Sequence, residues 1–144
     1  MKIDKIKIMP MEGCNILRFG ASDSDVMTAL GEPDERENIE DEDYDSEIWY
    51  YDEMGITLFL DEMEDEGLLV SGMEFEENNL ELEGVSIIGK TIDEMKALGK
   101  KFDFGEFEME TEEWGEIRLS FEDKLLDFYF DDEKKLTSVS LGME

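Results

Sequence analysis

Asp25-Val-Met-Thr-Ala-Leu-Gly31 recurs further along the chain as Asp93-Glu-Met-Lys-Ala-Leu-Gly99. Five of the seven positions are identical, at an offset of 68 residues. Shorter matches flank this pair in the same order, since residues 12–20 match 83–89 and residues 58–62 match 128–132. Because the order is kept and the offsets are nearly constant, the sequence predicts two copies of one structural unit.

Each copy is predicted to begin with a short helix. Thr91 and Glu94 have the spacing of a capping box, in which each side chain bonds a free backbone N–H at the start of a helix. Asp23 occupies the matching cap position in the first copy. Gly31 and Gly99 are expected to end the two helices in left-handed turns. Helices of two to three turns are not stable alone, so they must pack against other elements.

Alternating apolar and polar residues predict antiparallel strands after each helix. The predicted strands cover residues 48–51, 56–60 and 68–75 in the first copy and 104–111, 117–121, 126–130 and 137–141 in the second. The acidic segment 34–43 is expected to be irregular or to form a sheet edge.

The predicted fold is therefore α+β. It has two tandem repeats, at about 12–79 and 83–144, each a short helix followed by three or four antiparallel strands. The strands are expected to form one curved sheet with the helices packed on one face. The whole chain, 1–144, is predicted to be a single domain with an N-terminal edge segment at 1–11.

Composition excludes several classes of function. The chain has 144 residues, 42 of them acidic and 13 basic, for a formal net charge of −29. Such a charge repels nucleic acid phosphates and anionic membranes, so neither is an expected partner. The chain has no histidine and one cysteine, Cys14, which removes the commonest general base, any intrachain disulfide and a thiolate zinc site. No signal peptide and no membrane span are recognised, so a cytoplasmic location is expected.

The acidic charge is concentrated in the first copy. Residues 32–83 contain 22 acidic residues and one basic residue, Arg36, for a net charge of −21. Residues 84–144 contain 16 acidic and eight basic residues, for a net charge of −8. A surface of this kind either serves solubility or attracts a basic partner quickly.

Two glycine-and-helix motifs carry a resemblance to a known family. Gly20 with residues 25–33, and Gly89 with residues 93–99, resemble the β-lactamase-inhibitor-protein-like fold, in a layout that covers nearly the whole chain. The resemblance implies a curved sheet whose concave face binds another protein. The chain departs from the secreted inhibitors, which are disulfide-bonded, so no inhibitory residue is carried over.

The acidic run from residue 41 to 47 is a candidate site. Asp41, Asp43 and Asp45 have the spacing of calcium-loop positions 1, 3 and 5. Ser46 stands where such a loop needs glycine, and Asp52 stands where it needs a bidentate glutamate. We therefore expect no metal site here and interpret the three aspartates as binding a basic protein.

Aromatic residues follow this run. Because neighbouring strand residues face opposite ways, either Tyr50 or the pair Trp49 and Tyr51 faces solvent. An exposed pair would provide an aromatic anchor ringed by negative charge. Trp49 and Tyr51 therefore join the three aspartates as predicted partner-binding residues, with Trp114 as a weaker candidate.

The sequence shows no catalytic constellation, and neither enzyme activity nor a cofactor is expected. The leading hypothesis is a small acidic protein-binding module, an inhibitor or a bacterial toxin immunity protein, that occludes a basic partner. A secretion chaperone for an effector protein, or a soluble protein with no catalytic role, are the alternatives. Either a monomer or a homodimer is compatible with the sequence.

Overall fold

Two β-sheets and two short α-helices make up the fold, in a computed structural model that describes residues 6–40, 45–63, 67–76 and 80–142. The eight-stranded sheet has, in spatial order, β3 (Glu35–Glu40), β4 (Asp45–Tyr51), β5 (Ile56–Met63), β6 (Gly67–Glu76), β12 (Leu136–Gly142), β11 (Leu126–Phe130), β10 (Ile117–Phe121) and β9 (Glu108–Thr111). The four-stranded sheet has β2 (Gly13–Cys14), β1 (Ile6–Met9), β7 (Leu80–Leu82) and β8 (Val85–Ser86). The helices are α1 (Asp23–Leu30) and α2 (Ile92–Lys101), with a 3-10 turn at Glu122–Lys124.

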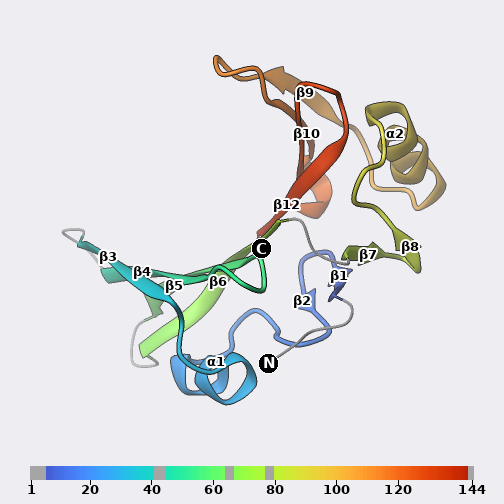
Figure 1. Cartoon of the computed structure of the whole chain (residues 1–144). Coiled ribbons are helices and arrows are strands. Elements are labelled where there is room, and N and C mark those ends of the chain that lie inside the picture. The colour runs from blue at the N-terminus through green and yellow to red at the C-terminus, as the bar shows by residue number, and fades with distance from the viewer. Residues whose placement is uncertain (1–5, 41–44, 64–66, 77–79, 143–144) are drawn as a thin grey trace.

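The large sheet consists of two antiparallel meanders joined side by side. We call β3–β6 the N-terminal wing and β9–β12 the C-terminal wing; the wings meet where β6 pairs with β12. The sheet bends at this junction, so that the wings enclose an open angle (Figure 1). We call the side inside this angle the concave face and the opposite side the outer face.

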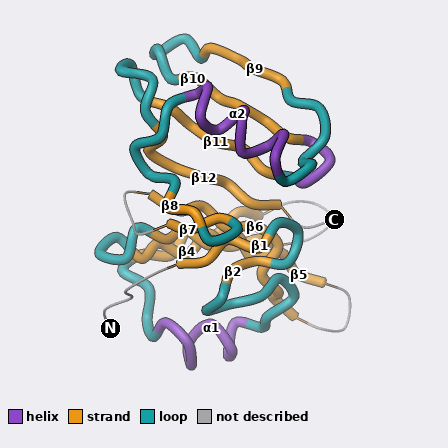
Figure 2. Tube along the Cα trace, turned by 90° about the vertical axis from the view of Figure 1, so that its right-hand side faces the viewer, coloured by secondary structure: helices purple, strands orange, loops and turns teal. Residues whose placement is uncertain are grey.

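The outer face is covered in three parts. One helix packs against each wing, and the four-stranded sheet lies between the helices at the corner (Figures 1 and 2). The helices bury few residues, since α1 buries Val26 and Leu30 while α2 buries Met95 and Gly99. The middle of the core is instead filled by the small sheet, including Ile6, Ile8, Leu80 and Leu82.

The prediction of an α+β fold built from tandem helix-and-strand repeats is therefore wrong. The described chain is mostly β, with two short helices, one large antiparallel sheet and a second sheet that the sequence did not indicate. The N-terminal segment was expected at an edge. Instead β1 lies inside the small sheet, between β2 and a parallel neighbour, β7. Two short strands over 70 residues apart leave no periodic signal, so this pairing is invisible in local sequence.

Both helices begin with capping boxes. Thr91 and Glu94 cap α2 as predicted, with the Glu94 N–H donating to Thr91 Oγ1 at 3.2 Å and the Thr91 N–H donating to the Glu94 carboxylate at 3.1 Å. The bond from the Thr91 N–H to the carboxylate, followed by a hydrogen bond from the Thr91 side chain, lowers the pKa of Glu94, because both favour its charged form. In α1 the cap is Ser22, which exchanges bonds with Asp25, rather than the predicted Asp23.

The two helices end differently. Gly31 ends α1 as predicted and has a positive φ of +82°, but its ψ of −162° lies outside the left-handed helical region, so the turn differs from the predicted one. Gly99 lies inside α2, which continues to Lys101 and is followed by Phe102 at the C-cap, so the predicted helix end at Gly99 is wrong. A proline at position 33 follows Gly31 closely, whereas Lys100 and Lys101 follow Gly99 and favour the helix.

Candidate functional site

Alternation along the strands separates the core from the concave face. The residues that point to the covered outer face are almost all apolar and less than 5% exposed: Trp49, Tyr51, Ile56, Leu58, Leu60, Val70, Met73, Phe75, Leu119, Phe121, Leu126, Phe128, Phe130, Val139 and Leu141. Their strand neighbours point to the concave face, where no described helix or strand covers them (Figure 1). Among the described residues the concave face is therefore a large open surface.

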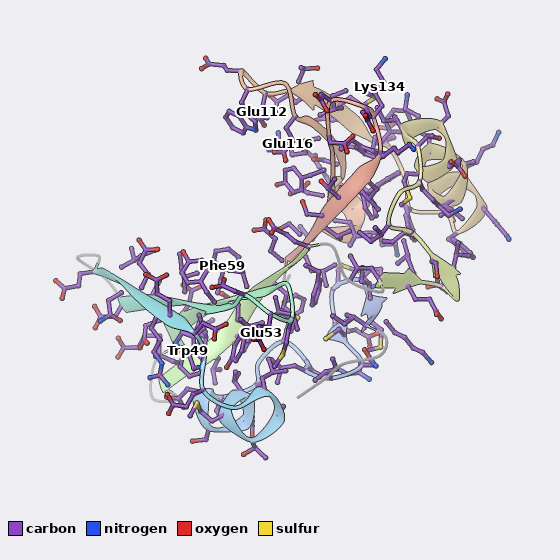
Figure 3. All side chains as sticks on the ribbon, in the orientation of Figure 1. Trp49, Glu53, Phe59, Glu112, Glu116 and Lys134 are labelled. Carbon is purple, nitrogen blue, oxygen red and sulfur yellow. The ribbon has the colours of Figure 1, made fainter. Side chains whose placement is uncertain are left out.

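Three partly exposed aromatic side chains lie on the concave face. Tyr50 and Phe59 belong to the N-terminal wing and Tyr129 to the C-terminal wing. Figure 3 shows Phe59 on this side of the N-terminal wing and Trp49 on the opposite side. Phe59 lies opposite Gly72, and a Cβ added at Gly72 would stand 3.3 Å from its ring, so the ring lies over a position without a side chain.

Hydrogen bonds hold polar side chains of the N-terminal wing in place. The Tyr50 hydroxyl donates to Glu37 Oε2 at 2.8 Å. The Asp61 carboxylate accepts from Ser46 and Ser71, each at 2.6 Å. A face fixed in this way loses little side-chain entropy when a partner binds.

Carboxylates surround these aromatic residues. On the concave side lie Glu35, Glu37, Asp61, Glu74, Glu76, Glu108, Glu110, Glu116 and Asp127. Arg118 lies among them on β10 and forms an ion pair with Glu110 across the strands. The concave face therefore has an excess of negative charge.

Glu74 stands where the two wings meet. Its strand, β6, pairs with β12, and Glu74 lies opposite Ser140. Burial raises the pKa of Glu74, and the charges of Glu76 and Glu116 raise it further. Glu116, labelled in Figure 3, belongs to the C-terminal wing, so charges from both wings act on the Glu74 carboxylate.

The negative charges of the concave face also shift the pKa of two tyrosines, Tyr50 and Tyr129. The hydrogen bond to Glu37, followed by partial desolvation and the charges of Glu37, Glu35 and Glu74, raises the pKa of Tyr50. Burial, with the charges of Asp127 and Glu74, raises the pKa of Tyr129 although Arg118 opposes this. Both hydroxyls therefore stay protonated at neutral pH. The single proton of Tyr50 goes to Glu37, so this hydroxyl can accept a hydrogen bond from a partner, while the Tyr129 hydroxyl can donate one.

Two of the five predicted partner-binding residues are in the core. Trp49 and Tyr51 are each 2% exposed, so the predicted aromatic anchor is wrong and Tyr50 is the member of the run that faces outward. Burial raises the pKa of Tyr51 to about 12, and its hydroxyl donates to the Gly31 carbonyl at 2.8 Å. The Arg36 guanidinium lies over the Trp49 ring, with Cζ 4.3 Å from the ring centroid.

The predicted aspartates are at the edge of the N-terminal wing. Asp45 is exposed at the start of β4, opposite Glu40 of the edge strand β3. Asp41 and Asp43 lie outside the described residues. Asp45 alternates with Ser46, which bonds Asp61 on the concave face, so Asp45 points to the outer side at the sheet edge. Its role in binding a partner stays a prediction.

The structure adds an exposed tryptophan that the sequence ranked low. Trp114, in the turn between β9 and β10, is 73% exposed. Its indole N–H donates to Glu116 at 3.3 Å. The sequence did not indicate Phe59, Tyr129 or Glu74 as site residues, and it indicated Trp114 only as a weaker candidate.

Metal and membrane sites are not indicated in the described part of the chain. Within the described ranges no three carboxylates or cysteines gather closely enough to hold a metal ion. No helix in those ranges is long and apolar enough to cross a bilayer. Burial raises the pKa of the Cys14 thiol, which keeps it protonated and unreactive.

Comparisons with known proteins bear on the fold alone. No family model matches the sequence, and no curated protein is similar to it in sequence. A solved structure of an extracellular protein containing an SCP domain, from Bacillus anthracis str. Ames, matches with a TM-score of 0.52 and 14% identity. The match covers 90% of this chain and 45% of that protein, so the chain spans less than half its length. The resemblance to the β-lactamase-inhibitor-protein-like fold stays a prediction.

Proposed function

We propose that the protein is a binding module that occludes a basic partner protein with the concave face of its bent sheet. The observation that carries the proposal is the grouping of Tyr50, Phe59 and Tyr129 on one open face among an excess of carboxylates. Aromatic side chains at the centre of an interface commonly supply most of the binding energy. Carboxylates around them select a cationic surface and speed its approach.

The shape of the sheet supports a protein as the ligand. Both wings present residues to the same open angle (Figure 1), so a convex surface seated there contacts Phe59 on one side and Tyr129 on the other. An inhibitor or an immunity protein against a toxin acts in this way, by covering an active site. Such a role requires no catalytic residue in this chain, and a cytoplasmic location remains part of the proposal.

Affinity capture tests the proposal. The immobilised protein is exposed to extracts of its own cells and culture medium at ~50 mM and ~500 mM salt, a range over which exposed charges become strongly screened. We expect one stoichiometric basic protein that remains bound at the higher salt. Diffuse cationic proteins that wash off would contradict the proposal and leave the charge as a solubility feature.

Matched variants then locate the interface. Phe59→Ser with Tyr129→Ser removes one aromatic side chain from each wing of the concave face. Ile88→Ser is the control, because Ile88 is 37% exposed and lies outside the eight-stranded sheet. We expect the double variant to lose the salt-resistant partner and the control to keep it; equal retention by both would exclude the concave face.

A further inference from the structure

The free edge of β9 is unlike an ordinary solvated edge. β9 is the last strand of the C-terminal wing and pairs on one side with β10. Met109 of β9 is 43% exposed, and Phe107, just before the strand, is 45% exposed. Exposed edges with apolar side chains invite pairing with another chain, and natural proteins usually protect them.

The backbone of β9 shows which groups point outward. Glu112 N–H donates to the Glu116 carbonyl at 2.7 Å, so this facing pair is hydrogen-bonded. Facing pairs in antiparallel sheets alternate between bonded and non-bonded. In the register of β9 with β10, Glu108 and Glu110 are then bonded to β10, while the N–H and C=O of Met109 and Thr111 point to the free edge.

A groove lies beside this edge on the outer face. It has a volume of about 720 Å³ and lies between the flank of α2 and the segment that leads into β9, with Phe107 and Phe121 among its walls. The two rings stand 6.1 Å apart, and Lys96 Nζ lies 5.1 Å from the Phe107 centroid. A strand that pairs with β9 and continues past Glu108 would bring apolar side chains beside Phe107, one wall of this groove.

The other face of β9 is acidic. Glu108 and Glu110 alternate with Met109 along β9, and Glu112 faces Glu116 just after the strand. Glu110 forms an ion pair with Arg118 of the neighbouring strand β10, whereas Glu108 lies opposite Ser120. The pattern thus matches a strand with basic side chains on one face and apolar side chains on the other.

We propose that β9 takes an extended segment of a basic partner as an additional antiparallel or parallel strand. In that segment lysine or arginine alternates with apolar residues: the apolar side chains enter the groove beside α2, and the basic ones face Glu108 and Glu110. Main-chain bonds to Met109 and Thr111 supply affinity, and the alternating side chains supply selectivity. This inference rests on the proposed function, since it takes the partner to be basic.

Amide hydrogen exchange followed by NMR tests the inference on the full chain. The probe is the hexapeptide acetyl-Lys-Val-Lys-Val-Lys-Val-amide, and the control peptide has the same composition in two blocks, three lysines and then three valines. We expect the alternating peptide to slow exchange at Met109 and Thr111 by at least about tenfold, because their amides become hydrogen-bonded. The amides of Glu108 and Glu110, and those of the opposite edge strand β3, should change little.

A pair of variants at one position separates the backbone from the side chain. Met109→Pro removes an N–H that points away from β10, which edge strands tolerate, while Met109→Ala keeps that N–H. We expect peptide affinity to fall at least about tenfold further in the proline variant than in the alanine variant, because only proline removes a main-chain bond. Equal affinities in the two variants would overturn the inference.

Other outcomes also decide the matter. Absence of binding at millimolar peptide, or equal binding of the block peptide, would overturn the edge-strand inference. Binding that shifts only signals of Tyr129 and Arg118, and vanishes at high salt, would overturn it as well. Each of these results leaves the concave-face proposal standing, because that proposal is tested by capture and by the Phe59 and Tyr129 variants.

Discussion

The two wings pack a short helix against the sheet with different residues. Each must bring a short helix close to the outer face of a four-stranded meander. In the N-terminal wing a large side chain of the sheet fills the space under the helix: Trp49, 2% exposed, lies on the outer face where α1 packs. In the C-terminal wing the helix has no side chain at the contact, because Gly99 is buried within α2 and the ring of Phe121 packs against it.

The Leu-Gly pair of the recurring motif shows the difference most clearly. Gly31 ends α1 with φ +82° and ψ −162°, a conformation that is essentially restricted to glycine. Gly99 has a helical position, and a Cβ there would stand 2.5 Å from Phe121 Cζ. One glycine is required by its backbone and the other by its neighbour, so a shared motif does not imply a shared role.

The largest predicted effect separates the two tryptophans. Trp49→Ala should lower the free energy of unfolding by about 3–5 kcal/mol, because it empties a large core position. Trp114→Ala should change it by less than about 0.5 kcal/mol, since this side chain is 73% exposed. Urea unfolding followed by far-UV circular dichroism measures both, and equal effects would contradict the assignment of Trp49 to the core.

Gly31 provides the next test. Gly31→Ala should cost about 1–3 kcal/mol, because alanine must adopt a strained backbone conformation. Nothing lies within 4 Å of the added Cβ, so shrinking a neighbour should not recover the loss. Full recovery in a Tyr51→Phe background, which removes the hydroxyl bonded to the Gly31 carbonyl, would argue against backbone strain as the cause.

Gly99 should behave in the opposite way. Gly99→Ala gains about 1 kcal/mol of helix propensity, but it forces the Phe121 ring from its place against Phe104 and Phe128, at a cost of about 1–3 kcal/mol. The net effect should be a modest loss of stability. In a Phe121→Leu background the same change should become neutral or stabilising, and a double-mutant cycle with no coupling would contradict the contact.

The smallest effect concerns the carboxylate at the bend. The folded protein raises the pKa of Glu74 above its ordinary 4.5, so ionised Glu74 lowers stability at neutral pH. Glu74→Gln should therefore stabilise the protein by about a few tenths of a kcal/mol. The gain should be full above the raised pKa and shrink as pH falls through it toward 4.5.

Thermal unfolding of wild type and Glu74→Gln across this pH range checks the sign. A gain that grows on acidification would contradict the assigned shift. The same variant should bind a basic partner more weakly, because it removes a negative charge from the concave face at the junction of the two wings. Stability and binding would then move in opposite directions, as they often do at functional sites.

Local pattern in the sequence predicts individual strands well. Residues 117–121 and 126–130 alternate strictly, and both form strands with these bounds, β10 and β11. Period-two alternation reports local geometry, which neighbouring residues decide. The small sheet could not be predicted in this way, since β1 and β7 are short and their parallel pairing depends on distant contacts.

The candidate site was predictable in kind but not in residues. Acidic and aromatic side chains on one sheet face were expected, and the concave face has them. Alternation predicts that Tyr50 and Trp49 lie on opposite faces but does not say which face becomes covered. That depends on the register, which sets Trp49 opposite Leu58 and Tyr50 opposite Thr57.

Hydroxyl-radical footprinting of the captured complex tests the central claim most directly. Tyr50 and Phe59 report on the N-terminal wing and Tyr129 on the C-terminal wing, while Ile88 is the exposed reference outside the large sheet. We predict that the partner lowers the labelling of all three aromatic residues and leaves Ile88 unchanged. Protection of Ile88 with unchanged labelling of Tyr50, Phe59 and Tyr129 would show that the partner binds elsewhere and would contradict the account.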